Sequence, residues 1–188
     1  MQEIELINEC KKYNPLAQKI IYKKYYSLFL RISIRYVSDT EDAKDIVQDA
    51  FLKIFSNINS FKSEGSFEGW MKRIVVNDTL TFVKKKSKNN TESISEFSDI
   101  ESNINNFKEE TEDDQEDIHP KFTEEELLAA IHSLPEIYKI VFNLICIEHY
   151  SHKEASALLN ISEENSRIRL MKARQKLKKI VMAKMVKV

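Results

Sequence analysis

The sequence contains very few residues that break helices: two glycines and three prolines occur among its 188 residues. Sheets need many tight turns, and tight turns draw heavily on glycine and proline. Apolar residues recur instead with helical spacing over residues 16–86, and again from Phe122 almost to the C-terminus. The chain is therefore predicted to be all-α.

The net charge of −1 hides a strong segregation of charge along the chain. Residues 1–90 carry 16 Lys and Arg against 11 Asp and Glu, residues 91–126 carry 2 against 14, and residues 127–188 carry 11 against 5. Two basic parts that flank an acidic segment favour binding to a polyanion through the basic parts. The alternative is that helical surfaces are simply rich in charge, and charge alone does not decide between the two.

The domain organisation follows the same boundaries. The acidic segment is also rich in Ser and Asn and has only isolated hydrophobic residues, a composition typical of a linker. We therefore predict two small helical domains, residues 1–88 and 122–188, joined by a flexible acidic linker over 89–121.

Several functional classes are not indicated. The apolar runs are shorter than the roughly 18 residues that span a bilayer, and the N-terminus is acidic rather than signal-like, so we expect a cytoplasmic protein with no membrane insertion. Cys10 and Cys146 show no metal-ligand or disulfide spacing, and His149 and His152 have no third ligand in register. Neither a Gly-rich phosphate loop nor a catalytic pairing of carboxylate and histidine occurs. We expect no enzyme activity, no metal or other cofactor and no small-molecule substrate.

The segment DAKDIVQDAFLKIF, residues 42–55, is predicted to form an amphipathic helix. Its core stripe consists of five apolar residues: Ala43, Val47, Ala50, Phe51 and Ile54. The opposite face carries Asp45, Gln48, Asp49 and Leu52. A leucine within an acidic patch is the mixture expected where a partner protein docks. Periodicity alone favours the alternative that this face is ordinary solvent surface.

Both glycines, Gly65 and Gly69, lie in a loop that also contains Phe61 and Phe67, and a helix is predicted to begin near Trp70. The apolar face of that helix is predicted to hold Phe67, Met71, Ile74, Val75 and Phe82. A separate stripe carries Arg73, Asn77, Leu80 and Lys84 and leads into a lysine cluster. The stripe suits a nucleic-acid backbone, and the loop suits an unstacked base. The alternative is a basic last turn that complements the helix dipole.

The C-terminal part has the pattern of a helix-turn-helix. A helix is predicted from Pro135, a short helix from about Ser151 to Leu159, a tight connection at Asn160 and Ile161, and a long helix from Ser162, its N-cap.

The long helix is predicted to pack through Ser166, Leu170, Ala173 and Leu177. Its outward face is centred on Glu164, Ile168, Met171, Lys172 and Gln175, with Asn165 near it and Arg167, Arg169 and Arg174 at its flanks. The arginines suit phosphate contacts, Asn165 suits an adenine edge, and Ile168 or Met171 suits a thymine methyl group. The alternative is a basic surface helix on a protein-binding bundle.

The combination of these motifs resembles the extracytoplasmic-function group of bacterial RNA polymerase sigma factors. The resemblance rests on DAKDIVQDAFLKIF and SFEGWMKRIVVN in the first half, and on LPEIYKIVFNLICIEHYSHKEASALLNIS and KARQKL in the second. It covers about residues 20–86 and 122–180. The pairing of the two halves is specific, whereas either half alone is weaker.

The resemblance implies a protein that binds core RNA polymerase and promoter DNA and starts transcription at chosen promoters, with an anti-sigma factor as a further partner to look for. It implies that Asp45, Gln48, Asp49 and Leu52 meet the polymerase. The −10 element would contact Phe61, Lys62 and Gly65 in the loop and Arg73, Asn77 and Lys84 on the following helix. The −35 element would contact seven residues of the recognition helix: Asn165, Arg167, Ile168, Arg169, Met171, Lys172 and Arg174.

Two other protein classes share parts of the pattern. A response-regulator-like transcription factor has a similar terminal helix-turn-helix, but the N-terminal half shows no βα pattern of a phospho-acceptor domain. A diverged adaptor or antagonist that kept only the polymerase-docking face is the other alternative. Gel shift combined with pull-down on core polymerase separates the three.

Overall fold

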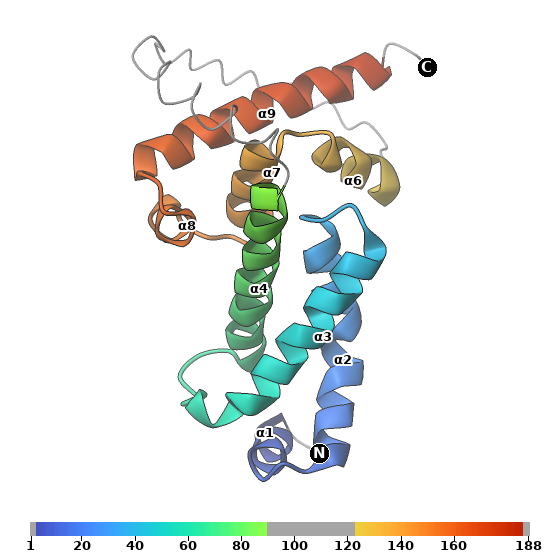
Figure 1. Ribbon diagram of the computed structural model, residues 1–188, viewed down its shortest axis with the longest axis vertical. Helices are drawn as coiled ribbons and strands as arrows, with labels where there is room; N and C mark the ends of the chain where they lie inside the picture. Colours follow the sequence, from blue (N-terminus) through green and yellow to red (C-terminus); the bar gives the residue numbers. More distant parts are fainter. Residues whose placement is uncertain (1–2, 90–122, 186–188) are drawn as a thin grey trace. The chain divides into compact units, whose positions relative to one another are not determined.

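The computed structural model describes residues 3–89 and 123–185, and all the regular structure in these ranges is helical. The prediction of an all-α chain is confirmed for them. The first range holds α1 (Glu3–Lys11), α2 (Pro15–Ile34), α3 (Thr40–Ser56), the 3-10 turn η1 (Ile58–Ser60) and α4 (Phe67–Asn89) (Figure 1). The second holds α6 (Glu124–His132), α7 (Glu136–Phe142), the π-helical turn η4 (Asn143–Ile147), α8 (His152–Leu159) and α9 (Glu163–Met185). Apart from Asn89, the linker expected over 89–121 lies outside the described residues.

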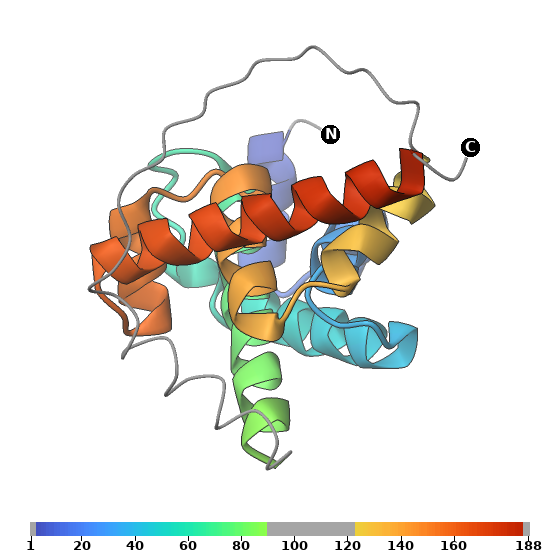
Figure 2. The same ribbon diagram turned by 90° about the horizontal axis from the view of Figure 1, so that it is seen from above.

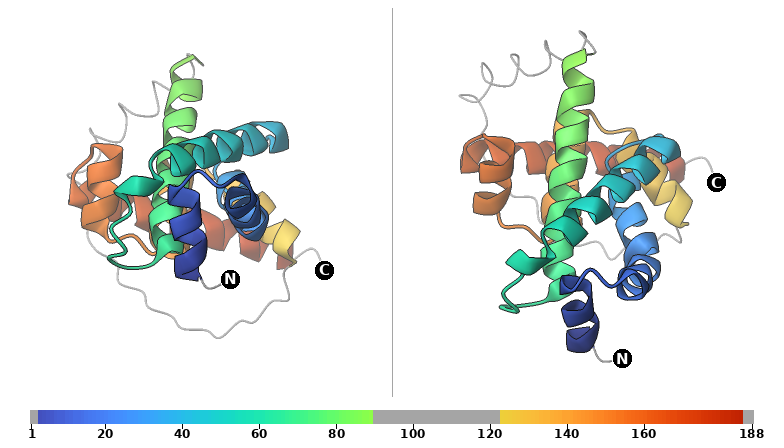
Figure 3. Two further views of the ribbon diagram at one scale, coloured as in Figure 1. Left: turned by 90° about the horizontal axis from the view of Figure 1, so that it is seen from below. Right: turned by 60° about the horizontal axis from the view of Figure 1, so that its bottom comes forward.

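The chain divides into two compact units, residues 1–83 and 84–188. In the first unit α2 and α3 run side by side (Figure 3). The ring of Phe51 on α3 lies 4.6 Å from the ring of Tyr22 and 5.3 Å from that of Phe29, both on α2. The predicted core stripe of α3 is buried throughout, so its opposite face is held outward by this packing.

Helix α4 buries a row of residues four apart: Phe67, Met71, Val75, Thr79 and Val83. Such a row winds around the helix, as expected where a helix crosses its neighbours at an angle. Because the buried side rotates along α4, Leu80 is only 3 % exposed. Its predicted place on the exposed stripe was wrong, and Ile74 and Phe82, expected in the core, are half-buried.

Helix α1 was not predicted from the sequence. Its nine residues bury Leu6, Ile7 and Cys10, and it packs on α2 and η1. Burial raises the pKa of Cys10 to about 11, so this thiol stays protonated at neutral pH. Helix α4 begins at Phe67, one turn before the predicted start at Trp70.

In the second unit α7 packs against α9 (Figure 2). The core joins Leu134, Ile137 and Tyr138 to Ala173 of α9. Two capping boxes fix the starts of the shorter helices, Thr123 with Glu126 at α6 and Ser151 with Glu154 at α8. No helix in the described part of the chain is long and apolar enough to cross a membrane.

The turn of the helix-turn-helix lies where it was predicted. Asn160 adopts the left-handed conformation, with φ 57° and ψ 49°, and ends α8. The Ile161 amide then donates to the Ser156 carbonyl at 3.1 Å. The Ser162 hydroxyl accepts from the Asn165 amide at 3.0 Å, which confirms Ser162 as the cap of α9.

We predict that Asn160→Val lowers the free energy of unfolding of the second unit by about 1–2 kcal/mol, because a β-branched residue pays the full steric cost of the left-handed region. Asn160→Gly should be neutral within about 0.5 kcal/mol, since glycine adopts this conformation freely. Chemical denaturation followed by circular dichroism measures both. Equal stability of the two variants would contradict the role of Asn160 as a left-handed cap.

Candidate protein- and nucleic-acid-binding surfaces

The outward face of α3 presents a single large apolar side chain among acids. Asp45, Gln48 and Asp49 are exposed, and Leu52 is 63 % exposed. We call these four residues the α3 face. Ile46, at its border, is buried. Because the other side of this helix is fully packed, the exposed leucine is held in a fixed position.

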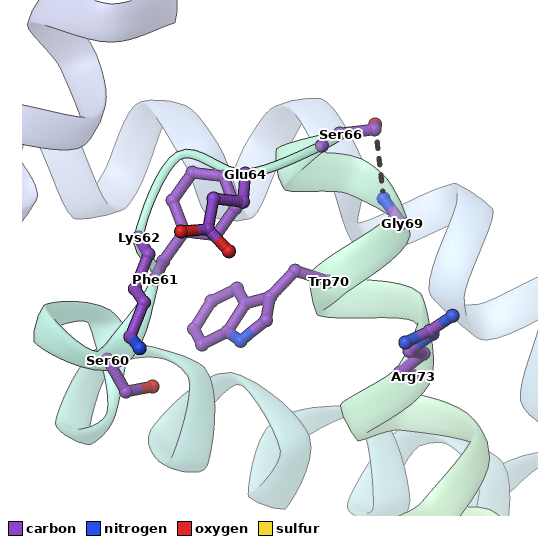
Figure 4. A pocket seen from close by; sticks show the side chains of 9 residues that line it. Ser60, Phe61, Lys62, Glu64, Ser66, Gly69, Trp70 and Arg73 are labelled. Carbon is purple, nitrogen blue, oxygen red and sulfur yellow. Dashed lines mark hydrogen bonds between the residues drawn. The ribbon is translucent and has the colours of Figure 1, made fainter.

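The connection from η1 to α4, residues 61–66, encloses a pocket of about 370 Å³, which we call the loop pocket (Figure 4). It is lined by Ser60, Lys62, Glu64 and Gly65 before α4 and by Trp70 and Arg73 of α4. Gly65 has φ +90°, a conformation that only glycine adopts without strain. The loop therefore depends on Gly65 for its shape.

Phe61 does not stand free to stack on a ligand. Its side chain is 5 % exposed, and its ring centroid lies 5.1 Å from that of Phe67 and 5.5 Å from that of Trp70. The phenylalanine was expected at the base-binding surface of the loop, and the structure places it in the floor below. Trp70, half-buried, is the aromatic ring that the pocket exposes.

Lys11 at the end of α1 holds the first residue of the loop. Its Nζ donates a hydrogen bond of 3.0 Å to the main-chain carbonyl of Phe61. At the other end of the loop, the Ser66 hydroxyl accepts from the Gly69 amide at 3.3 Å. Sequence reasoning missed Lys11, because no local pattern relates two residues that are 50 positions apart.

On α4 the exposed stripe is shorter than predicted. Arg73, Asn77 and Lys84 are exposed at spacings of four and seven residues, and Leu80 is absent from it. Arg73 also lines the loop pocket. The stripe therefore leads directly into the loop pocket.

The two helices of the helix-turn-helix are joined by a side-chain contact. His152 Nδ1, at the start of α8, lies 2.9 Å from the Ser166 hydroxyl of α9, which is fully buried. Burial lowers the pKa of His152, and the Arg167 guanidinium lowers it further. The imidazole is therefore neutral at neutral pH and holds α8 onto the first turns of α9.

Arg169 is placed differently from the other arginines of α9. It is 8 % exposed and belongs to the packed row with Ser166, Leu170 and Ala173, whereas Arg167 and Arg174 are exposed. Its expected place at the flank of the outward face is therefore wrong, because residues 166, 169, 170 and 173 share one face of a helix. The remaining predicted residues, Asn165, Ile168, Met171 and Lys172, are half-buried.

No group of three His, Cys, Asp or Glu side chains placed to hold a metal ion occurs in residues 3–89 and 123–185. His149 and His152 therefore show no metal-binding arrangement here. Cys146 lies 3.8 Å from the Arg174 guanidinium, a weak contact to a surface cation.

Comparisons with known proteins match both units. Residues 21–89 match Sigma-70 region 2, and residues 124–177 match Sigma-70 region 4. The chain is 28 % identical over 148 residues to the ECF RNA polymerase sigma factor SigE of Mycolicibacterium smegmatis, and 27 % identical over 158 residues to SigM of Bacillus subtilis. It belongs to the extracytoplasmic-function sigma factors. The match covers 79 % of the chain and 55 % of SigE, and 84 % of the chain and 91 % of SigM.

Solved structures agree on the fold. The sigma factor RpoE of Bartonella quintana, determined with the anti-sigma factor NepR, gives a TM-score of 0.56 at 17 % identity over 87 % of this chain and 96 % of that one. CnrH, determined with the cytosolic domain of CnrY, gives 0.54 at 18 % identity over 95 % and 96 %. Such low identities establish the helical fold alone.

Family membership decides the general function. This sigma factor directs RNA polymerase to promoters through regions 2 and 4, and region 4 carries the helix-turn-helix. Sigma factors act by binding and catalyse no reaction, so the protein is not an enzyme. The alternative of a response regulator is thereby set aside.

We predict that Lys11→Met speeds amide hydrogen exchange in residues 61–66 about fivefold, the factor for a hydrogen bond of about 1 kcal/mol. Methionine keeps the apolar stem and removes only the donor. Lys12→Met, which removes an exposed lysine bonded to Glu9, is the matched control and should leave the loop unchanged. Identical exchange in both variants would show that Lys11 does not anchor the loop.

Proposed function

We propose that the two units divide the work of promoter recognition among three surfaces. In this proposal the α3 face binds core RNA polymerase, the loop pocket and the α4 stripe bind the −10 element, and α9 reads the −35 element. The observation that carries it is that the region 2 match contains both the α3 face and the loop pocket, and the region 4 match contains the helix-turn-helix.

The chemistry of the α3 face supports polymerase docking. Leu52 offers apolar area to bury, while Asp45 and Asp49 on the preceding turns of the same face favour a partner with basic residues beside an apolar site. Gln48 adds an uncharged donor and acceptor. The packing of Phe51 against α2 keeps the face rigid, so little conformational entropy is lost on binding.

The loop pocket supports capture of a base from the −10 element. Unstacking a base costs a few kcal/mol, and stacking of that base on the Trp70 ring in the loop pocket would offset part of this cost. Lys62 is exposed on the loop and suits the backbone of the captured nucleotide, as do Arg73 and Lys84 along α4. Phe61 contributes as the floor of the pocket, and Gly65 through the backbone turn.

For the −35 element we propose a division between base contacts and phosphate contacts on α9. Asn165 suits an adenine edge, Ile168 and Met171 suit thymine methyl groups, and Lys172 suits a guanine edge. The exposed Arg167 and Arg174 suit phosphates. Arg169 then supports the packing of α9 and acts on DNA only by keeping the helix in place.

Three further points belong to the same proposal. A flexible acidic linker over 89–121 would let the two units reach elements separated along the promoter, which its polar composition supports. The protein would act in the cytoplasm, where promoter DNA and polymerase meet. An anti-sigma factor is a proposed regulator, supported by the structure of RpoE with NepR.

In vitro transcription with core RNA polymerase on genomic fragments tests the proposal. Transcripts that start downstream of a shared pair of sequence elements, and only when this protein is added, are the expected result. Mapping the start sites also defines the −10 and −35 sequences. Binding to polymerase without any transcript would favour the adaptor or antagonist alternative.

We predict that Asp45→Arg combined with Asp49→Arg abolishes co-purification with core polymerase, because the reversed charges repel a basic partner surface. Circular dichroism should show an unchanged helical content, since both side chains are exposed. Reversal of Glu5 on α1, also exposed, is the control and should leave binding intact. Undiminished binding by the double variant would refute the docking assignment.

We predict that Arg167→Ala and Arg174→Ala each weaken binding to −35 DNA about equally for all sequences and lower the slope of log K against log salt by about 1. Arg169→Ala should instead lower the melting temperature, since it removes a packed side chain. Fluorescence anisotropy at several salt concentrations measures the slopes. An unchanged slope in both exposed variants would place the phosphate contacts elsewhere.

A further inference from the structure

A second pocket of about 320 Å³ lies beside the loop pocket in the first unit, and of the residues that line it only Ser60, Trp70 and Asn77 belong to the surfaces proposed above. It shares Ser60 and Trp70 with the loop pocket, so the indole forms a wall of both. Its other walls include Lys53 of α3 and Ile74, Asn77 and Asp78 of α4. Figure 4 shows the Trp70 ring reaching from α4 toward Ser60.

The most buried polar side chain of this second pocket is that of Asp78. Its Oδ1 accepts a hydrogen bond of 2.7 Å from Lys53 Nζ, and the side chain is 14 % exposed. Its Oδ2 is buried and has no hydrogen-bond partner among the described residues. A buried carboxylate oxygen without a donor is unfavourable, and Asp78 lines the second pocket, so a hydrogen-bond donor that enters this pocket could satisfy it.

The walls define which donor fits. The Asp78 carboxylate is paired with Lys53, so this pocket carries no net positive charge that would bind the sugar-phosphate backbone. The Trp70 ring and the Ile74 side chain offer flat apolar surface, which suits the face of a base. Adenine, cytosine and guanine carry an exocyclic amino group that can donate to Asp78 Oδ2, and Asn77 at the rim adds an amide. Thymine carries no amino group: its pairing edge offers a single N3–H between two carbonyl oxygens, and at least one of these oxygens would face the Asp78 carboxylate.

We propose that the second pocket holds a second unpaired base that carries an exocyclic amino group, next in the strand to the base in the loop pocket. The inference rests on the proposed function of the loop pocket. Trp70 then separates two neighbouring bases, one on each side. Asp78 selects against thymine at the second position, and Lys53 fixes the carboxylate so that Oδ2 faces the base.

The test uses complete holoenzyme and a promoter mapped by transcription. Forked promoter fragments differ only in the non-template base at one of the positions next to the captured base. With the natural protein, thymine at one such position should reduce open-complex formation about tenfold, the factor for one charge-assisted hydrogen bond of about 1.4 kcal/mol. Asp78→Asn should remove or reverse this preference, because an amide can donate to a thymine carbonyl.

Each base preference is the ratio of open complex formed on two fragments by the same protein preparation. A smaller folded fraction of Asp78→Asn lowers both amounts equally and leaves this ratio unchanged. Glu41→Gln, an exposed acid at the start of α3, is the matched control and should keep the natural ratios. The inference alone fails if the natural protein forms open complexes but Asp78→Asn shows the same base preferences as the natural protein at every position. The second pocket would then hold water and no base. If the natural protein forms no open complex on any fragment, the proposed function and this inference fail together.

Discussion

Helix ends have to be closed almost without glycine in this chain, and side chains do most of that work. Asn14 and Asp39 cap α2 and α3, Thr123 and Ser151 form capping boxes, and Ser162 caps α9. Besides Gly65, four non-glycine residues of the described ranges adopt a positive φ, which is unfavourable for most side chains: Tyr13, Ser63, His149 and Asn160. The directions in which the functional helices leave their turns depend on these local contacts.

Two of the proposed binding surfaces, on α3 and on α9, each lie opposite a packed face of the same helix. The α3 face is exposed because Phe51 and its neighbours are buried against α2. The outward side of α9 is exposed because Ser166, Leu170 and Ala173 are buried. A substitution in either core would therefore impair binding without touching a partner, through a shift of the helix.

Much of the fold follows from periodicity, and so do the α3 face and the turn at Asn160. The predictions from periodicity assume that a helix buries one fixed face along its whole length, and they were wrong where this assumption does not hold. Leu80 is buried because the packed side of α4 rotates along its length, and Arg169 is buried although its charge suggests a surface position. Phe61 packs against Phe67 and Trp70 with tilted rings and is 5 % exposed. Lys11 and the pocket at Asp78 depend on residues far apart in the chain, and no local pattern contains that information.

The anchor between Lys11 and the loop has a consequence for how such a protein can change. Lys11 binds the main-chain carbonyl of Phe61, and every residue type offers that carbonyl. The side chains of residues 62–64 can therefore be exchanged while the start of the loop stays in place. If the loop binds the −10 element as proposed, its promoter preference is open to redesign by substitutions at a few exposed positions.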